Sequence, residues 1–233
     1  MHTAASFALW FSLLGADGVP VGELMMPAAR LREPDRAEPY LPREGDLVFY
    51  DDRSVVWTPL FAMAGTGPPL HMGMVVRKSG GGLAVLEAGP DDSVWVKLLD
   101  LRPRLKQFHA DFPKGDITIR RCKVPLTRTQ SAALTKFAHA QNGKRYAVLR
   151  LLAQGTSIRA RGPLEPLLAK TDLERDSWMC SELSVACGSV AGLLDGNQIR
   201  ANATYPRDLV DNERHDLGAV WEDAAVWWPS ASN

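Results

Sequence analysis

The sequence predicts an α+β fold in which an antiparallel sheet forms first and helices then pack on one of its faces. Between residues 46 and 124, short segments rich in β-branched and aromatic residues alternate with Gly, Pro and Asp, as strands do. From residue 127 onward, apolar residues recur at helical spacing. With 45% hydrophobic and 23% charged residues among 233, the composition is that of a folded chain rather than a disordered one.

The first 40 residues are expected to form a helix and an extended lead-in. Residues 4–15 are apolar, and we interpret them as a helix that packs on the core, because they are too few to cross a bilayer. A cleaved signal peptide is the alternative, but the first basic residue is Arg30, so the usual basic start is missing. Residues 30–44 are rich in proline and charge, which is typical of an extended segment. Whether residues 1–28 are retained stays open.

A single domain is expected over residues 41–233. Its predicted strands, with a hairpin turn at 78–82 between the second and third, are residues 46–50, 71–77, 83–88, 93–99 and 116–124. Its predicted helices are residues 127–141, 146–152 and 180–194, with a loop insertion at 154–177. Residues 195–233 form a C-terminal extension that includes an aromatic patch at Trp221, Trp227 and Trp228.

Charge and cysteine content exclude several classes of function. Lys+Arg and Asp+Glu both number 27, so the whole chain offers no basic surface for nucleic acid. Three cysteines cannot form a disulfide framework, and no Cys-x-x-Cys pair offers a zinc site. These counts favour a reducing compartment or a thiol with a chemical role, and we expect no metal and no organic cofactor.

Three residues together indicate nucleophilic catalysis. Cys180 lies in the first turn of the last predicted helix, where the helix dipole favours a thiolate, and its position on the apolar stripe directs it to the sheet. His71 opens a strand whose residues alternate between faces. Pairing across the hairpin places Glu87 opposite His71 or diagonal to it. A carboxylate there would orient an imidazole that activates the thiol, as in a catalytic triad.

Each of these residues also has an ordinary structural explanation. Cys180 could be a small buried side chain, as we expect for Cys122 and Cys187. His71 could be a hydrogen-bonded strand residue, and Glu87 could pair with one of the many arginines. The predicted geometry brings the three residues together, and a cysteine, a histidine and a carboxylate fit a single catalytic mechanism. This favours the catalytic interpretation.

The same residues resemble a known family. The segments Gly143–Tyr146 and Trp178–Leu183 are similar to the cysteine half of NlpC-type, papain-like cell-wall cysteine peptidases. The segments Leu41–Tyr50 and His71–Val76 are similar to the histidine half, and Thr204–Leu209 extends the likeness. The histidine half comes first here, as in the circularly permuted branch that includes YiiX-like proteins and, more distantly, lecithin–retinol acyltransferase relatives. The resemblance implies a circularly permuted papain-like fold.

The resemblance also implies roles for individual residues. Cys180 matches the nucleophile, His71 the base and Glu87 the polar residue that orients it. Tyr146 matches a tyrosine whose hydroxyl helps to bind the oxyanion, although a simple packing role is almost as well supported. The family usually has proline where this chain has Arg145. The connection from Tyr146 to Cys180 is long and contains an arginine-rich stretch, which we expect to shape the cleft.

The resemblance implies a cysteine hydrolase that cleaves an amide bond without a cofactor. The expected substrate is a peptide or acyl compound of the bacterial envelope, most simply a peptidoglycan peptide. The chain would be cytoplasmic in its producer or leave it by a non-classical route. It would suit an antibacterial effector toxin, with a secretion apparatus or an immunity protein as partner. No integral membrane segment is expected.

Two other functions stay open. One is a lipid-directed acyltransferase or hydrolase of the same fold, which an apolar acyl groove would favour over a polar cleft. The other is a catalytically dead binding module that uses exposed tryptophans of the C-terminal extension. The second alternative predicts that His71 and Cys180 lie too far apart to interact.

Overall fold

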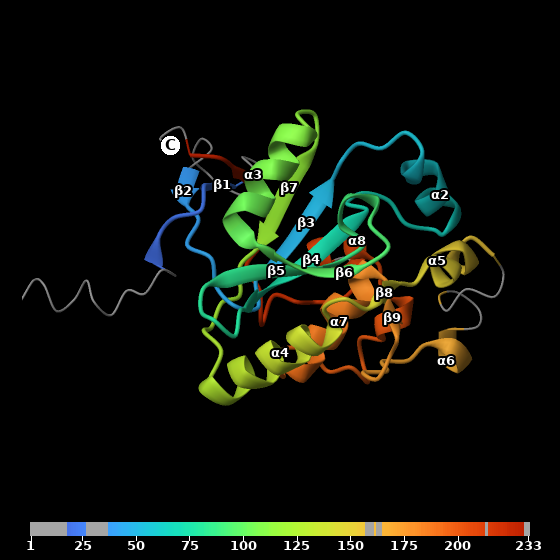
Figure 1. The fold of residues 1–233 in the computed structure, drawn as a ribbon. Helices are drawn as coiled ribbons and strands as arrows, with labels where there is room; N and C mark the ends of the chain where they lie inside the picture. The colour runs from blue at the N-terminus through green and yellow to red at the C-terminus, as the bar shows by residue number, and fades with distance from the viewer. Residues whose placement is uncertain (1–17, 27–36, 157–160, 162–164, 213, 231–233) are drawn as a thin grey trace, which may run out of the picture.

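The structure, a computed structural model, describes residues 18–26, 37–156, 161, 165–212 and 214–230. The predicted helix at 4–15 and the first part of the lead-in lie outside the described residues. Those that are described form one large antiparallel sheet, to which helices and a second, two-stranded sheet are added (Figure 1).

The large sheet has eight strands in the order β2-β1-β10-β7-β3-β4-β5-β6, and every neighbouring pair is antiparallel. The strands are β1 (Glu23–Met25), β2 (Ala37–Pro39), β3 (Leu47–Asp51), β4 (His71–Arg77), β5 (Leu83–Ala88), β6 (Val96–Asp100), β7 (Asp116–Arg120) and β10 (Ala225–Trp228). The central strands β4 and β5 have the predicted bounds, because their alternating apolar residues and the glycine-rich turn at 78–82 fix both ends.

Both ends of the described chain contribute strands that the sequence pattern did not reveal. Strand β10, from the predicted C-terminal extension, pairs with β7 on one side and with β1 on the other. Its Trp227 and the nearby Trp221 are buried, at 2% and 0% exposure, while Trp228 is 44% exposed. The expectation of exposed tryptophans is therefore wrong for two of the three, because both indoles pack in the core and donate hydrogen bonds to backbone carbonyls.

Helices cover both faces of the sheet, which corrects the prediction of helices on one face. Helices α4 (Arg128–Gln141) and α7 (Cys180–Val190) pack against one face, and α3 (Leu101–Asp111) packs against the other (Figure 1). Helix α3 was missed because its sequence carries many charged residues, and only Leu101, Leu105 and Phe108 of its apolar side chains are buried.

The remaining elements lie near one end of the central strands (Figure 1). They are the helices α2 (Trp57–Met63), α5 (Val148–Gln154), α6 (Glu165–Leu168) and α8 (Pro206–Val210), the turns η3 (Pro90–Asp92) and η4 (Ala201–Ala203), and the parallel pair β8 (Arg145–Tyr146) and β9 (Ser177–Trp178). Helix α6 lies within the predicted loop at 154–177, and Tyr146 lies on β8 instead of opening a helix.

Candidate active site

His71 and Glu87 meet at the start of strand β4. Strand pairing places Glu87 opposite Gly73, so His71 is its diagonal neighbour on the same face, which is one of the two predicted arrangements. His71 Nε2 lies 2.8 Å from Glu87 Oε2. Gly73 makes this contact possible, because a Cβ at that position would lie 2.8 Å from Glu87 Cγ and 2.7 Å from Val85 Cγ2. The glycine leaves room for the carboxylate that binds the imidazole.

Glu87 is fully buried, and three side chains satisfy its carboxylate. Besides His71, the Tyr50 hydroxyl donates to Oε1 at 2.8 Å. The Arg104 guanidinium donates to both oxygens, from Nε at 2.9 Å and from Nη2 at 3.0 Å. The two interpretations of Glu87, as partner of a histidine and as partner of an arginine, are therefore both correct.

Three further members of this site, Arg104, Tyr50 and Asp91, were not predicted from the sequence. Arg104 Nη1 donates to the two oxygens of Asp91 at 2.7 and 3.0 Å, so the arginine joins Asp91 to Glu87. Tyr50 is the Cα partner of His71 on the neighbouring strand. The strand pattern could have found Tyr50, since it ends a predicted strand, but no local signal marks Arg104 or Asp91.

Cys180 is the first residue of helix α7 and lies beside His71. The Cys180 side chain lies close enough to the imidazole for its hydrogen bonding and charge to raise the pKa of His71. Because Nε2 is engaged by Glu87, Nδ1 is the ring nitrogen that remains for the thiol. Cys180 is 4% exposed, while Cys122 and Cys187 are buried at 1% and 0%. The structure thus brings together the three residues Cys180, His71 and Glu87.

A second buried glutamate fixes the start of helix α7. Glu182 is fully buried and accepts a hydrogen bond from the Met179 backbone N–H at 3.0 Å, as in a capping box. Its carboxylate also binds Arg150 Nη2 at 2.7 Å and Arg175 Nη1 at 3.2 Å. These contacts anchor the turn that carries Cys180.

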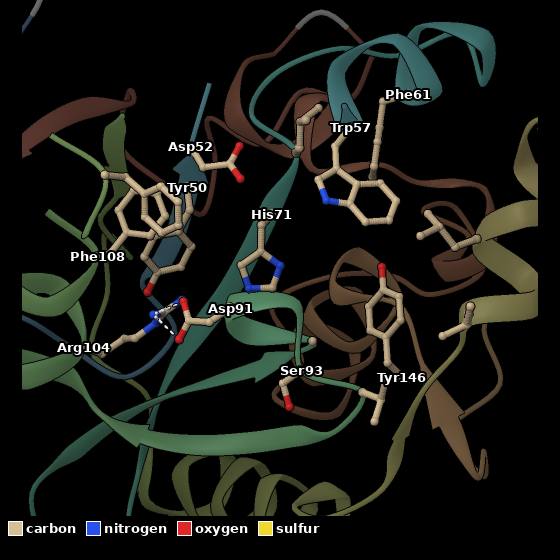
Figure 2. Close-up of a pocket in the computed structure, with 16 residues that line it drawn as sticks. Tyr50, Asp52, Trp57, Phe61, His71, Asp91, Ser93, Arg104, Phe108 and Tyr146 are labelled. Atoms are coloured by element: carbon tan, nitrogen blue, oxygen red, sulfur yellow. Dashed lines mark hydrogen bonds and ion pairs between the residues drawn. The ribbon is translucent and has the colours of Figure 1, made fainter. Parts of the chain in front are cut away.

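Tyr146 lies on the opposite side of His71 from Tyr50 (Figure 2). Its backbone N–H donates to Val94 O at 2.8 Å, and its ring packs on Gly89, where a Cβ would lie 2.7 Å from Tyr146 Cδ2. Figure 2 shows its hydroxyl directed into the pocket. Burial and the nearby charges of Cys180 and Glu182 hold the pKa of Tyr146 well above its usual value, so the hydroxyl stays protonated and can donate.

A pocket of about 330 Å³ opens in front of these side chains (Figure 2). His71 and Tyr146 line it, whereas Cys180 does not, so the thiol lies next to the wall that these two side chains form. Most of the lining is apolar or aromatic: Tyr50, Trp57, Phe61, Leu70, Val94, Phe108, Phe112, Tyr146, Val148 and Leu151. Of the arginine-rich stretch expected to shape the cleft, only Arg161 is described, and it pairs with Asp208 away from this lining.

The charges of the site favour a protonated imidazole. Burial by itself lowers the pKa of His71, but hydrogen bonds to Cys180 and Glu87 and the charges of both groups raise it to about 10. Burial by itself raises the pKa of Glu87, but His71 and Arg104 lower it to about 2. Glu87 is thus a permanent negative charge behind a histidine that gains stability when it is protonated.

Within the residues that the structure describes, no group of three or more His, Cys, Asp or Glu side chains could hold a metal ion. No helix among them has the length and the apolar character needed to cross a membrane.

No family model matches the chain, and no curated protein matches it. A solved structure with a similar fold is the metalloprotein YiiX from Escherichia coli O157:H7. The two chains share 19% sequence identity, with a TM-score of 0.49, and the match covers 82% of this chain and 99% of that one.

Proposed function

We propose that the protein is a cysteine hydrolase that cleaves an amide bond through Cys180, His71 and Glu87. The observation that carries the proposal is one imidazole that hydrogen-bonds to a fully buried carboxylate and lies close to a thiol at a helix start. This is the arrangement that nucleophilic catalysis by cysteine requires. It also fits the proposed resemblance to permuted NlpC-type enzymes.

The proposed reaction has two steps. The Cys180 thiolate attacks the carbonyl carbon, and His71 gives its proton to the nitrogen of the leaving amine as the C–N bond breaks. The resulting thioester is then attacked by water, whose proton returns to His71 as the carboxylic acid leaves. The Tyr146 hydroxyl, directed into the pocket, and the backbone N–H groups at the start of α7 are suited to bind the oxyanion of each step (Figure 2).

The pocket supports a substrate with an apolar group next to the bond that is cleaved. Aromatic and aliphatic side chains dominate its lining, and they would bind an alkyl or aromatic group more strongly than a peptide of small polar residues. A bacterial envelope amide, including a peptidoglycan peptide, remains the proposed substrate class, and an effector toxin the proposed setting.

A second candidate function is a lipid-directed acyltransferase or hydrolase, in which the acyl group of a lipid occupies the pocket. Two observations favour it. The lining is largely apolar, and large apolar side chains are exposed beside it: Val55, in the turn before α2, is 87% exposed, and Leu149, on α5, is 82% exposed. Exposed apolar side chains around a pocket are typical of proteins that meet lipids or other apolar partners.

Trapping of the covalent intermediate tests both candidates. The protein is mixed with soluble peptidoglycan peptides or with phospholipid vesicles, quenched in acid and measured by intact mass spectrometry. We expect an acyl adduct on Cys180 that hydroxylamine removes, and no adduct in Cys180→Ala. Cys122→Ala is the matched control, because that thiol donates to Val124 O instead of lying beside His71.

The two substrates separate the candidates. An adduct from the peptides supports the amidase, and an adduct from the vesicles supports the lipid-directed enzyme. Turnover of either substrate by Cys180→Ala at the wild-type rate would contradict both.

A further inference from the structure

We propose that Arg104 and Asp91 are positioning residues that act on His71 through Glu87. The side chains of His71, Glu87, Arg104 and Asp91 form a chain of alternating charge, and Arg104 and Asp91 are its outer half. The importance of this chain for catalysis rests on the proposed function, but its effect on His71 can be measured without any substrate.

The chain is continuous and its contacts are short. His71 Nε2 lies 2.8 Å from Glu87 Oε2, and Arg104 binds both Glu87 oxygens at 2.9 and 3.0 Å. At its far end, Arg104 Nη1 binds both oxygens of Asp91 at 2.7 and 3.0 Å. A guanidinium that makes paired contacts with two carboxylates fixes direction as well as distance, which a lysine ammonium cannot do.

The chain runs from the core toward solvent. Glu87 is fully buried and the Arg104 side chain is 2% exposed, whereas the Asp91 side chain is 42% exposed. The Arg104 guanidinium carbon lies 5.0 Å from the centre of the Tyr50 ring and 5.8 Å from that of Phe108, so aromatic faces hold the arginine in place. Figure 2 shows Arg104 and Asp91 joined on the side of the pocket opposite Tyr146.

Asp91 also ties this chain to the pocket wall. Its backbone has a φ of 49°, in the left-handed region that a non-glycine residue adopts at a cost. The neighbouring Gly89 packs against the ring of Tyr146. The Asp91–Arg104 contact thus holds a strained turn that supports a second residue of the proposed site.

Alternating charge means that the two outer members act on His71 with opposite signs. Glu87 stabilises the imidazolium, while Arg104 neutralises part of that carboxylate and opposes the imidazolium. Asp91 neutralises part of Arg104 and so favours the imidazolium again. Loss of Arg104 should therefore raise the pKa of His71, and loss of the Asp91 charge should lower it.

Other groups face His71 and must stay unchanged in the comparison. They are Cys180 from α7, Tyr50 from β3, Tyr146 from β8 and Asp52, which lines the pocket after β3. None of them is altered in the variants Arg104→Gln and Asp91→Asn. The second variant is conformationally mild, because Asn tolerates a left-handed backbone at least as well as Asp.

The test is an NMR titration of the His71 imidazole in the full-length wild type, Asp91→Asn and Arg104→Gln, with the resonance assigned from His71→Gln. We expect the pKa of His71 to fall by roughly half a unit or more in Asp91→Asn and to rise by a similar amount in Arg104→Gln. Glu222→Gln is the matched control, because it breaks an arginine pair of similar length, with Arg121 at 2.6 Å. We expect no change there.

The outcomes are decisive for the chain and independent of turnover. If the pKa of His71 falls in both variants, the substitutions only weaken the contact between Glu87 and His71, and the proposal is overturned. If the pKa of His71 changes in neither variant, Arg104 and Asp91 do not act on His71, and the proposal is again overturned. If Arg104→Gln does not fold, Asp91→Asn decides alone, with a lowered pKa in support and an unchanged or raised pKa against. If Cys180→Ala proves fully active while the opposite shifts are observed, the proposed function fails and this inference stands.

Discussion

Two fully buried glutamates flank the candidate site, and they differ in what they bind. Glu87 lies on strand β5 and binds the imidazole of His71, the hydroxyl of Tyr50 and the guanidinium of Arg104. Glu182 lies in the first turn of α7 and binds the Met179 backbone N–H and two guanidinium groups. Both carboxylates are 0% exposed and both are paired with arginine.

The difference lies in the chemistry of the partners. Every partner of Glu182 keeps its proton at any working pH, so this glutamate can only hold the start of α7 in place. One partner of Glu87 is an imidazole, which can give and take a proton. Burial and pairing with arginine therefore do not by themselves mark a catalytic carboxylate, and the proposed role of Glu87 rests on its contact with a titratable base.

The largest effect is expected from Glu87→Gln. The amide keeps the shape of the side chain but removes the charge that stabilises protonated His71. If the proposed triad acts, kcat should fall about 10²–10⁴-fold, as it does when known triads lose their carboxylate. The rate of thioester formation on Cys180 measures this loss. A variant with wild-type rates would show that Glu87 is structural, like Glu182.

Glu182→Gln should affect folding instead. Its loss leaves two arginines without their buried counter-charge, so the free energy of unfolding should fall by about 3 kcal/mol, measured by urea titration. The rate of thioester formation should stay within about tenfold of wild type at temperatures where the variant is folded. If Glu182→Gln slows thioester formation as much as Glu87→Gln does, the role of Glu182 is not limited to holding the start of α7 in place.

Gly73→Ala tests the contact between Glu87 and His71 without changing either residue. The new methyl group would lie within 2.8 Å of Glu87 Cγ and 2.7 Å of Leu86 O, so the carboxylate must move away from His71. We expect a loss of about 1–3 kcal/mol in unfolding free energy, together with slower thioester formation. Gly80→Ala is the control, because a Cβ there meets nothing within 4 Å. If Gly73→Ala and Gly80→Ala have equal unfolding free energies and equal rates of thioester formation, Glu87 does not need the space that Gly73 leaves.

Tyr146→Phe should have a smaller effect on catalysis. The ring keeps its packing on Gly89, and only the hydroxyl directed into the pocket is lost. If that hydroxyl binds the oxyanion, kcat should fall about tenfold or more while the free energy of unfolding changes little. An unchanged kcat would leave Tyr146 with the packing role alone.

The smallest effect is a gradual dependence of stability on pH. Because the folded protein raises the pKa of His71 from 6.5 to about 10, its stabilising contribution is complete below about pH 6.5 and is lost as pH rises to about 10. Glu87, whose pKa is lowered from 4.5 to about 2, stabilises above about pH 4.5 and loses its contribution toward pH 2. Urea titrations across pH should show the alkaline loss in wild type and a smaller one in His71→Gln.

The sequence predicted the parts of the site that local rules determine. Strand alternation and the 78–82 turn placed Glu87 opposite His71 or diagonal to it, and the structure shows the diagonal arrangement. Helical spacing placed Cys180 at a helix start. Arg104 and Asp91 were missed because their contacts join elements whose relative placement no local pattern encodes. Helix α3 was missed for a related reason, since much of its surface is charged and its position depends on packing against the second face of the sheet.

The strands at the edge show the same limit. Strands β1, β2 and β10 have three or four residues each, and β1 pairs with β10 across most of the length of the chain. Such short segments carry little alternation of their own, so only the completed sheet determines their structure.

The central claim is that His71 and Cys180 act as a pair, and the alkylation rate of Cys180 at pH 6 tests it most directly. A small reagent such as iodoacetamide is used on wild type and His71→Ala, with the modified cysteine identified by peptide mass spectrometry. We expect fast modification of Cys180 in wild type and at least a tenfold slower reaction without His71. Slow modification of Cys180 that is the same in both proteins would contradict the account and leave this thiol as a packing residue.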